Sequence, residues 1–234
     1  MTLRGIGEAA VTEYVEVARA ESERGELVLR RRIEARTADA LELRVNGVFV
    51  MDTRETSSEI ELAAAALELV EDPRDVVVAG LGLGFTTQRV LVDRRVERVM
   101  VVEVEPALVG WMRDGTIPHG PSVLADKRVH IVDADIVMAV AEATSTYDLV
   151  LLDVDNGPGY LVHDTNSLIY EHDFIASTKS IISRGGALVV WSANPAPQLM
   201  AVMKDVFGNC TEHRYDVLLQ ERSEEYLLYL SRVS

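Results

Sequence analysis

Apolar and polar residues have two different periodicities along the chain, and the change occurs near residue 57. Before it, apolar residues alternate with polar ones over short runs, as expected for strands with one buried face. Asn46 and Gly47 separate two such runs, and both residues accept the positive φ of a two-residue hairpin turn. Residues 1–55 are therefore predicted to form a small antiparallel β domain.

From residue 56 to residue 234 the pattern alternates between short apolar runs and amphipathic segments with helical spacing. Thr56 and Glu59 have the spacing of a capping box, ahead of a helix rich in alanine and leucine. The apolar runs, such as VVVA, VMVV and LVLL, are typical of parallel strands buried on both faces. This second domain is predicted to be a parallel sheet with helices on both sides.

The last part of the chain breaks this alternation. The runs EHRYDVLLQ and EEYLLYLSR are joined by a polar segment too short for a crossover helix, so they are expected to pair antiparallel. An α/β sheet that finishes in such a hairpin is typical of class I methyltransferases. The predicted fold class is therefore α/β, a methyltransferase-like Rossmann sheet with a C-terminal antiparallel hairpin, preceded by the small N-terminal antiparallel β domain.

The charge balance limits the classes of partner that the chain is expected to bind. The chain has 38 acidic and 23 basic residues, and its formal net charge is −15. Without a basic patch to neutralise phosphates, a nucleic-acid partner is not expected, whereas a cationic small molecule would be attracted.

Cysteine content and hydropathy point to the cytoplasm. Cys210 is the single cysteine, so internal disulfides are excluded and a reducing compartment fits. No apolar run approaches the ~18 residues of a membrane span, and the N-terminus lacks the apolar core of a signal peptide. No histidine or cysteine pair has ligand spacing, so no metal site is predicted.

Three alternate glycines, Gly80, Gly82 and Gly84, follow the first predicted parallel strand. A dinucleotide fingerprint needs its third glycine one position later, where the chain has Phe85. An adenosyl-sulfonium cofactor has no pyrophosphate and needs bare backbone only beneath its ribose and tail. The loop is thus a candidate site for S-adenosylmethionine or its decarboxylated form, although tight strand-to-helix turns also use glycine for steric reasons alone.

Acidic residues close the next three predicted strands. They are Glu103, Asp135 and Asp153. Ligands of open α/β sheets bind beyond the carboxyl ends of the strands, so these side chains are expected to face one crevice with the glycine loop. A carboxylate at 103 can accept from ribose hydroxyls and one at 135 from the adenine amino group. Each could instead only cap a helix or form a turn.

The segments that carry these residues resemble the spermidine synthase family. DVVVAGLGLGF is similar to the family's glycine loop, VMVVEVEPALV to its ribose-binding strand end, DKRVHIVDAD to its adenine-binding segment and YDLVLLDVDNGPG to its catalytic loop. The resemblance implies that Glu103 binds ribose and Asp135 binds adenine. It also implies a polyamine product and a homodimer.

The chain departs from the family at residues that bear on the reaction. Leu83 stands where the family usually has an acid suited to the ammonium of the decarboxylated cofactor, and Asn156 falls at one alignment of the family's second catalytic Asp. A shorter loop alignment offers Asp155, so Asp153 and Asp155 are the predicted catalytic pair. The family's Tyr and His that help hold the polyamine are missing from TSSEIELA, where Glu61 is the matching acid.

These departures favour methyl transfer from S-adenosylmethionine to a small-molecule acceptor, because that cofactor brings its own carboxylate and needs no loop acid. Aminopropyl transfer that makes a polyamine is the alternative, with a cationic amine as acceptor. A third hypothesis is a non-catalytic scaffold that retains adenosyl binding.

Overall fold

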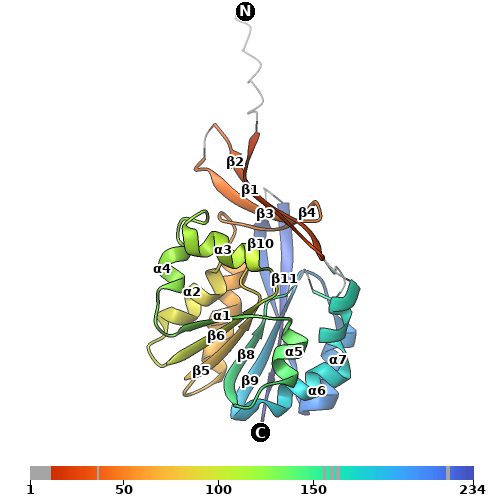
Figure 1. Cartoon of the computed structure of the whole chain (residues 1–234). Helices are drawn as coiled ribbons and strands as arrows, with labels where there is room; N and C mark the ends of the chain where they lie inside the picture. Colours follow the sequence, from red (N-terminus) through yellow and green to blue (C-terminus); the bar gives the residue numbers. More distant parts are fainter. Residues whose placement is uncertain (1–11, 36, 155–156, 159–160, 162–163, 220–221) are drawn as a thin grey trace, which may run out of the picture.

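The computed structural model describes residues 12–35, 37–154, 157–158, 161, 164–219 and 222–234. Within them the chain forms a four-stranded sheet and a seven-stranded sheet, with helices on both faces of the larger one (Figure 1). The fold class predicted from the sequence is confirmed.

The small sheet is antiparallel, and its strands follow the chain order: β1 (Glu13–Ser22), β2 (Gly25–Ile33), β3 (Ala40–Val45) and β4 (Val48–Asp52). The predicted hairpin turn joins β3 to β4, with φ of 51° at Asn46 and 77° at Gly47. In β2 the alternate residues Leu27 and Leu29 are buried, as expected for a strand with one inner face, whereas in β3 the four consecutive residues from Ala40 to Leu43 are all buried.

The large sheet has the order β10-β11-β9-β8-β5-β6-β7. Its parallel strands are β5 (Asp75–Ala79), β6 (Arg98–Glu103), β7 (Val129–Asp133), β8 (Tyr147–Leu152) and β9 (Ile182–Ser192). The terminal hairpin, β10 (Thr211–Leu219) and β11 (Arg222–Arg232), joins the sheet because β11 pairs antiparallel with β9. This is the arrangement predicted from the short polar connection.

Helices cover the large sheet on both sides (Figure 1). They are α1 (Ser57–Leu69), α2 (Phe85–Val92), α3 (Pro106–Asp114), α4 (Gly120–Leu124), α5 (Ile136–Ala141), α6 (His172–Ser180) and α7 (Pro197–Phe207), with a 3₁₀ helix at Asp164–Tyr170. In the part of the chain described, no helix combines the length and the apolar character needed to cross a membrane.

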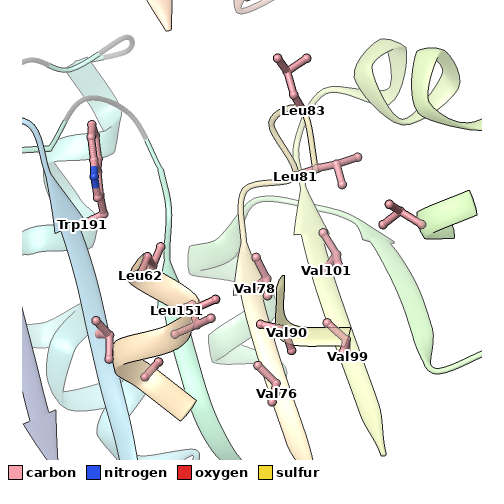
Figure 2. Packing of buried hydrophobic residues seen from close by; sticks show 14 of the residues in the cluster. Leu62, Val76, Val78, Leu81, Leu83, Val90, Val99, Val101, Leu151 and Trp191 are labelled. Atoms are coloured by element: carbon pink, nitrogen blue, oxygen red, sulfur yellow. The ribbon is translucent and has the colours of Figure 1, made fainter. Parts of the chain in front are cut away.

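Two apolar layers sandwich the sheet because successive strand residues point to opposite faces. Val76 and Val78 pack into one layer with α1 and α2, whereas Val77 and Ala79 pack into the other with α6 and α7. Figure 2 shows part of the first layer, including Leu62, Val76, Val78, Val90, Val99 and Val101.

The small sheet lies over the carboxyl ends of the parallel strands (Figure 1). Its inner residues Leu27 and Leu43 join the same apolar layer as Leu81 and Leu83 of the glycine loop. At the tip of β1, Ser22 Oγ donates to Glu105 Oε1 at 3.1 Å. The small sheet is thus packed on the large one, while the division of the chain at residue 55 remains a prediction.

The start of α1 differs from the predicted capping box. The helix begins one residue after Thr56, but the Thr56 side chain makes no capping hydrogen bond. Glu59 instead accepts from Ser58 Oγ at 2.7 Å and is 6% exposed. The spacing of the box is present, but its reciprocal hydrogen bonds are not formed.

Candidate active site

The carboxyl ends of β5, β6 and β8 and the start of α5 surround one cavity. Its empty space is about 870 Å³, part of it open to solvent, and its walls include Gly80, Gly82, Glu103, Asp135 and Asp153. Sequence reasoning had placed these residues in one crevice, and the structure brings them together. Gly84 is set back from the cavity at the N-cap of α2, and Asp155 lies outside the described residues.

The glycine loop is held by close backbone contacts. Gly80 has φ of 93°, and a Cβ built there would lie 2.2 Å from the carbonyl oxygen of Asp153. A side chain at this position would push the end of β8 away from β5. The steric explanation for the glycine is therefore correct at position 80, and the same bare backbone also lines the cavity.

Glu103 ties the loop to the end of β6. Its Oε2 accepts from the backbone N–H of Leu81 at 2.8 Å, and its Oε1 accepts from those of Val104 and Glu105 at 2.9 Å each. Burial raises the pKa of this carboxyl, while the three N–H donors act in the opposite direction. Because a carboxylate has about four acceptor sites, it can still accept from a ribose hydroxyl.

Asp135 caps a helix and also lines the first cavity. Its Oδ1 caps α5 by accepting from the backbone N–H of Val137 at 2.8 Å. The same side chain lines the cavity between the apolar residues Val102 and Ile136. This position suits an adenine ring, which needs apolar contact on its faces and an acceptor for its amino group.

A second cavity adjoins the first at the end of β8. It has about 590 Å³ of empty space, part of it open to solvent, and it shares Val50, Gly82 and Asp153 with the first. Apart from Met51 and Ser58, its other lining residues are acidic or aromatic: Asp52, Glu55, Glu59, Phe49, Trp191 and Tyr226. No lysine, arginine or histidine is among the described residues that line it.

The acids of this second cavity differ in how their charges are balanced. Asp52 Oδ2 lies 3.1 Å from Arg32 Nη1, and Asp52 Oδ1 accepts from the backbone N–H groups of Arg54 and Glu55. Glu55 Oε1 accepts from the backbone N–H of Ser57 at 2.8 Å. Asp52 is thus paired with a buried arginine that also contacts Glu34 and Glu42, whereas the donors to Glu55 among the described residues are neutral.

Asp153 is the acidic residue that lines both cavities. Its Oδ2 accepts from Thr86 Oγ1 at 2.6 Å, and burial raises the pKa of the carboxyl to about 6. Burial raises the pKa of Glu59 further, to about 7, and the charge of Asp153 adds to this rise. The two carboxyls therefore interact across the second cavity.

Sequence reasoning missed Glu59 and the aromatic wall. Glu59 had been interpreted as half of a capping box, and Glu61 was taken as the acid of that segment, but Glu61 lines neither cavity. Trp191 and Tyr226 stack edge to face, with ring centroids 5.0 Å apart, on neighbouring strands β9 and β11. Only the pairing of those strands shows that both rings reach the site.

Leu83 occupies the loop position where an acid was expected from the family pattern. Its side chain is fully buried in the first apolar layer and lines neither cavity. Figure 2 shows it on the loop after β5, beyond Leu81. The negative charge of the site therefore comes from β4, α1 and β8 and not from this loop.

Within the described residues, no group of three or more candidate ligands could hold a metal ion. A cavity over a glycine loop, at the carboxyl ends of an α/β sheet with a terminal hairpin, defines a class I methyltransferase-like protein. More narrowly, a family model described as "Spermine/spermidine synthase domain" matches residues 55–217. The chain belongs to the spermine/spermidine synthase family, which confirms the resemblance seen in the sequence.

Curated relatives are distant in sequence. The chain is 26% identical over 147 residues to a polyamine aminopropyltransferase of Sulfolobus acidocaldarius, covering 60% of this chain and 47% of the relative. It is 26% identical over 167 residues to polyamine aminopropyltransferase 2 of Pseudomonas aeruginosa, covering 67% and 46%. The chain thus spans about half the length of the curated relatives it matches.

Solved structures share the fold. A spermidine synthase in complex with the transition-state analogue AdoDATO has a TM-score of 0.78 at 15% identity, covering 99% of this chain and 82% of that one. The spermidine synthase of Thermotoga maritima has a TM-score of 0.76 at 14% identity, covering 99% and 81%. Human methyltransferase-like protein 13 in complex with SAH is less similar, with a TM-score of 0.59 at 18% identity and coverage of 76% and 82%.

Proposed function

We propose that this protein is an aminopropyltransferase, which moves the aminopropyl group of decarboxylated S-adenosylmethionine to an amine. The observation that carries the proposal is the meeting of an adenosyl-type cavity and an acidic cavity at Asp153. The names of the curated relatives support the same activity. Methyl transfer, which the departures at Leu83 and the catalytic loop favoured, thereby becomes the second candidate.

The first cavity supplies what the donor needs. The backbone at Gly80 and Gly82 passes beneath it, Glu103 has acceptor capacity for the ribose, and Asp135 has a free face toward the adenine position. Asp153, at the far wall, places negative charge on the side where a sulfonium would lie. These residues fit an adenosyl sulfonium without a pyrophosphate.

The second cavity supplies what an amine acceptor needs. Primary amines are mostly protonated at neutral pH, with a pKa above about 10. The carboxyls of Glu55, Glu59 and Asp153 offer negative charge to such a cation, and Trp191 and Tyr226 offer aromatic faces to a methylene chain or an ammonium. A neutral methyl acceptor would gain little from this wall.

The reaction needs little covalent chemistry from the protein. The nitrogen of the acceptor attacks the propyl carbon bonded to sulfur, the C–S bond breaks, and its electron pair remains on sulfur to give a neutral thioether. One proton leaves the ammonium before or during the attack. The protein contributes by aligning the two reactants, excluding water and accepting that proton. Asp153 is the described member of the predicted catalytic pair, and the role of Asp155 remains a prediction.

The test offers both cofactors to the purified protein. Incubation with decarboxylated S-adenosylmethionine and 1,4-diaminobutane should give methylthioadenosine and an elongated triamine by mass spectrometry, and calorimetry should show tighter binding of the decarboxylated form. Asp153→Asn should abolish the product while calorimetry still detects the cofactor. Preference for S-adenosylmethionine with a methylated amine would instead support methyl transfer, and binding without any product would support the scaffold hypothesis.

A further inference from the structure

Glu59 lies inside the acidic cavity on the first turn of α1. It is 6% exposed, and among the described residues the side-chain donor to its carboxylate is the neutral hydroxyl of Ser58, which reaches Oε2 at 2.7 Å. A carboxylate this buried is costly to ionise unless a cation is brought to it. An acid in the first turn also favours the helix dipole, but an exposed carboxylate would serve that purpose, so its burial in a cavity wall points to a chemical role.

The groups that face Glu59 are negative or neutral. Asp153 comes from the end of β8, Glu55 from the segment before α1, and Tyr226 from β11. Asp52 of β4 lines the same cavity and is paired with Arg32. Among the described lining residues no cation balances Glu59 or Asp153, so this balance must come from a proton or from a bound ligand.

Resting on the proposed amine acceptor, we propose that Glu59 and Asp153 form a proton-sharing carboxylate pair that receives the proton leaving the attacking nitrogen. Asp153 lines both the first cavity, proposed to hold the donor, and the second cavity, proposed to hold the acceptor, whereas Glu59 lines only the second. A bound ammonium lies between the two carboxyls and replaces the shared proton as their counter-charge. Glu59 is thus a second catalytic carboxylate, contributed by α1 and not by the loop after β8.

The protonation states fit this sequence of events. Burial, and next the charge of Asp153, raises the pKa of Glu59 to about 7. A base titrating near the working pH is effective in both accepting and releasing a proton. The acceptor ammonium gives one proton to the pair and becomes a neutral nucleophile. After the C–N bond forms and the C–S bond breaks, the product leaves as a secondary ammonium and the pair keeps the proton it received, which restores its shared-proton state; the one proton released per turnover is the one lost to water when the amine bound.

The first experiment compares Glu59→Gln with the matched control Glu61→Gln. Both substitutions replace a glutamate of α1, but Glu61 lines neither cavity. We expect Glu59→Gln to lower kcat by about 10²-fold or more and to remove the acid-side inflection near neutrality from the pH profile of kcat/KM. Glu61→Gln should behave like the unmodified protein. An unchanged kcat with only a raised KM would overturn the proposal, because it would show that Glu59 merely attracts the cation.

The second experiment needs no turnover. Titration of 1,4-diaminobutane by calorimetry in two buffers of different ionisation enthalpy, near pH 7, counts the protons released on binding. The unmodified protein and Glu61→Gln should release up to about one proton per amine bound, and Glu59→Gln clearly less. Equal release from all three proteins would overturn the proposal. If Glu59→Gln does not fold, Glu59→Asp replaces it and should retain proton release while kcat falls.

The two experiments separate this inference from the proposed function. If no elongated amine forms with the unmodified protein, the proposed transfer is wrong, and the proton release on amine binding still decides whether the pair exists. If the elongated amine forms but Glu59→Gln keeps the normal pH profile, the transfer stands and the pair is wrong.

Discussion

Individual polar residues of the site have two tasks each. Glu103 anchors the glycine loop through three backbone N–H groups and also lines the first cavity, and Asp135 caps α5 while lining the same cavity. Truncation to alanine therefore mixes a loss of stability with a loss of binding. Variants that keep one task and remove the other are more informative.

Asp135 allows such a separation. Asn is as good an N-cap as Asp, but its amide NH₂ cannot accept from an adenine amino group. Asp135→Asn should therefore leave the free energy of unfolding almost unchanged and weaken cofactor binding about tenfold. Asp135→Ala should weaken binding similarly and also cost about 1 kcal/mol of stability. Denaturant unfolding and calorimetry measure the two quantities; equal stability losses in both variants would contradict the separation.

Glu59 should make stability depend on pH. Its folded-state pKa is raised from 4.5 to about 7, so its contribution to stability is complete below about pH 4.5 and is lost as pH rises through 7. Glu59→Gln removes the titrating carboxyl and with it the loss of stability at high pH. At about pH 8 the variant should gain stability over the unmodified protein by up to roughly 3 kcal/mol more than at about pH 5. Urea unfolding at the two pH values provides the measurement, and a gain that is the same at both would contradict it.

Among individual site residues, the sequence predicted those at the carboxyl ends of the parallel strands. It missed those that reach the site from other elements. Gly80, Glu103, Asp135 and Asp153 could be placed because parallel strands bring their carboxyl ends together. Glu59 could not, because an acid three residues after a threonine has the same pattern whether it caps a helix or points into a cavity. Which task such an acid has is decided by tertiary packing.

The loop after β5 shows how an element can depend on single glycines. A Cβ at position 80 would meet backbone, the Asp153 carbonyl oxygen at 2.2 Å, whereas a Cβ at position 82 would meet the flexible Met51 side chain at 2.7 Å. Both glycines have positive φ, 93° and 50° respectively. Only the first contact would require two strands to separate.

Gly80→Ala should therefore be the more destabilising substitution. We expect it to cost about 2–4 kcal/mol, since strain at positive φ adds to a displacement of β8, and Gly82→Ala to cost about 1–2 kcal/mol. Denaturant unfolding of the two variants gives the comparison. A larger cost at position 82 would mean that the end of β8 yields more easily than Met51.

Secondary-structure elements were predicted well where the spacing of apolar residues and the length of the connections determine them. Continuous apolar runs predicted the buried parallel strands, and the short connection predicted the antiparallel terminal hairpin. The path of the small sheet over the strand ends could not be predicted, because its inner leucines carry no signal for which surface they cover. That placement brings Asp52 and Phe49 of β4 into the acceptor cavity.

For the whole molecule, the net charge of −15 acts on a cationic acceptor before it reaches the cavity. Long-range attraction is screened by salt, while contacts inside the cavity are screened less. Raising the salt concentration from about 20 mM to about 200 mM should lower kcat/KM for a diamine severalfold and leave kcat nearly constant. Steady-state kinetics at the two concentrations make the test. A change in kcat alone would show that salt acts on the chemical step and not on encounter.

Because Asp153 lines both cavities, a substitution there alters both, and under the proposed function donor and acceptor preferences cannot be tuned independently at that residue. Divergence toward new amines has more freedom at the outer wall formed by Phe49, Glu55 and Tyr226, which the donor cavity does not share. Engineering of acceptor range should begin with that outer wall, leaving the common carboxylate in place.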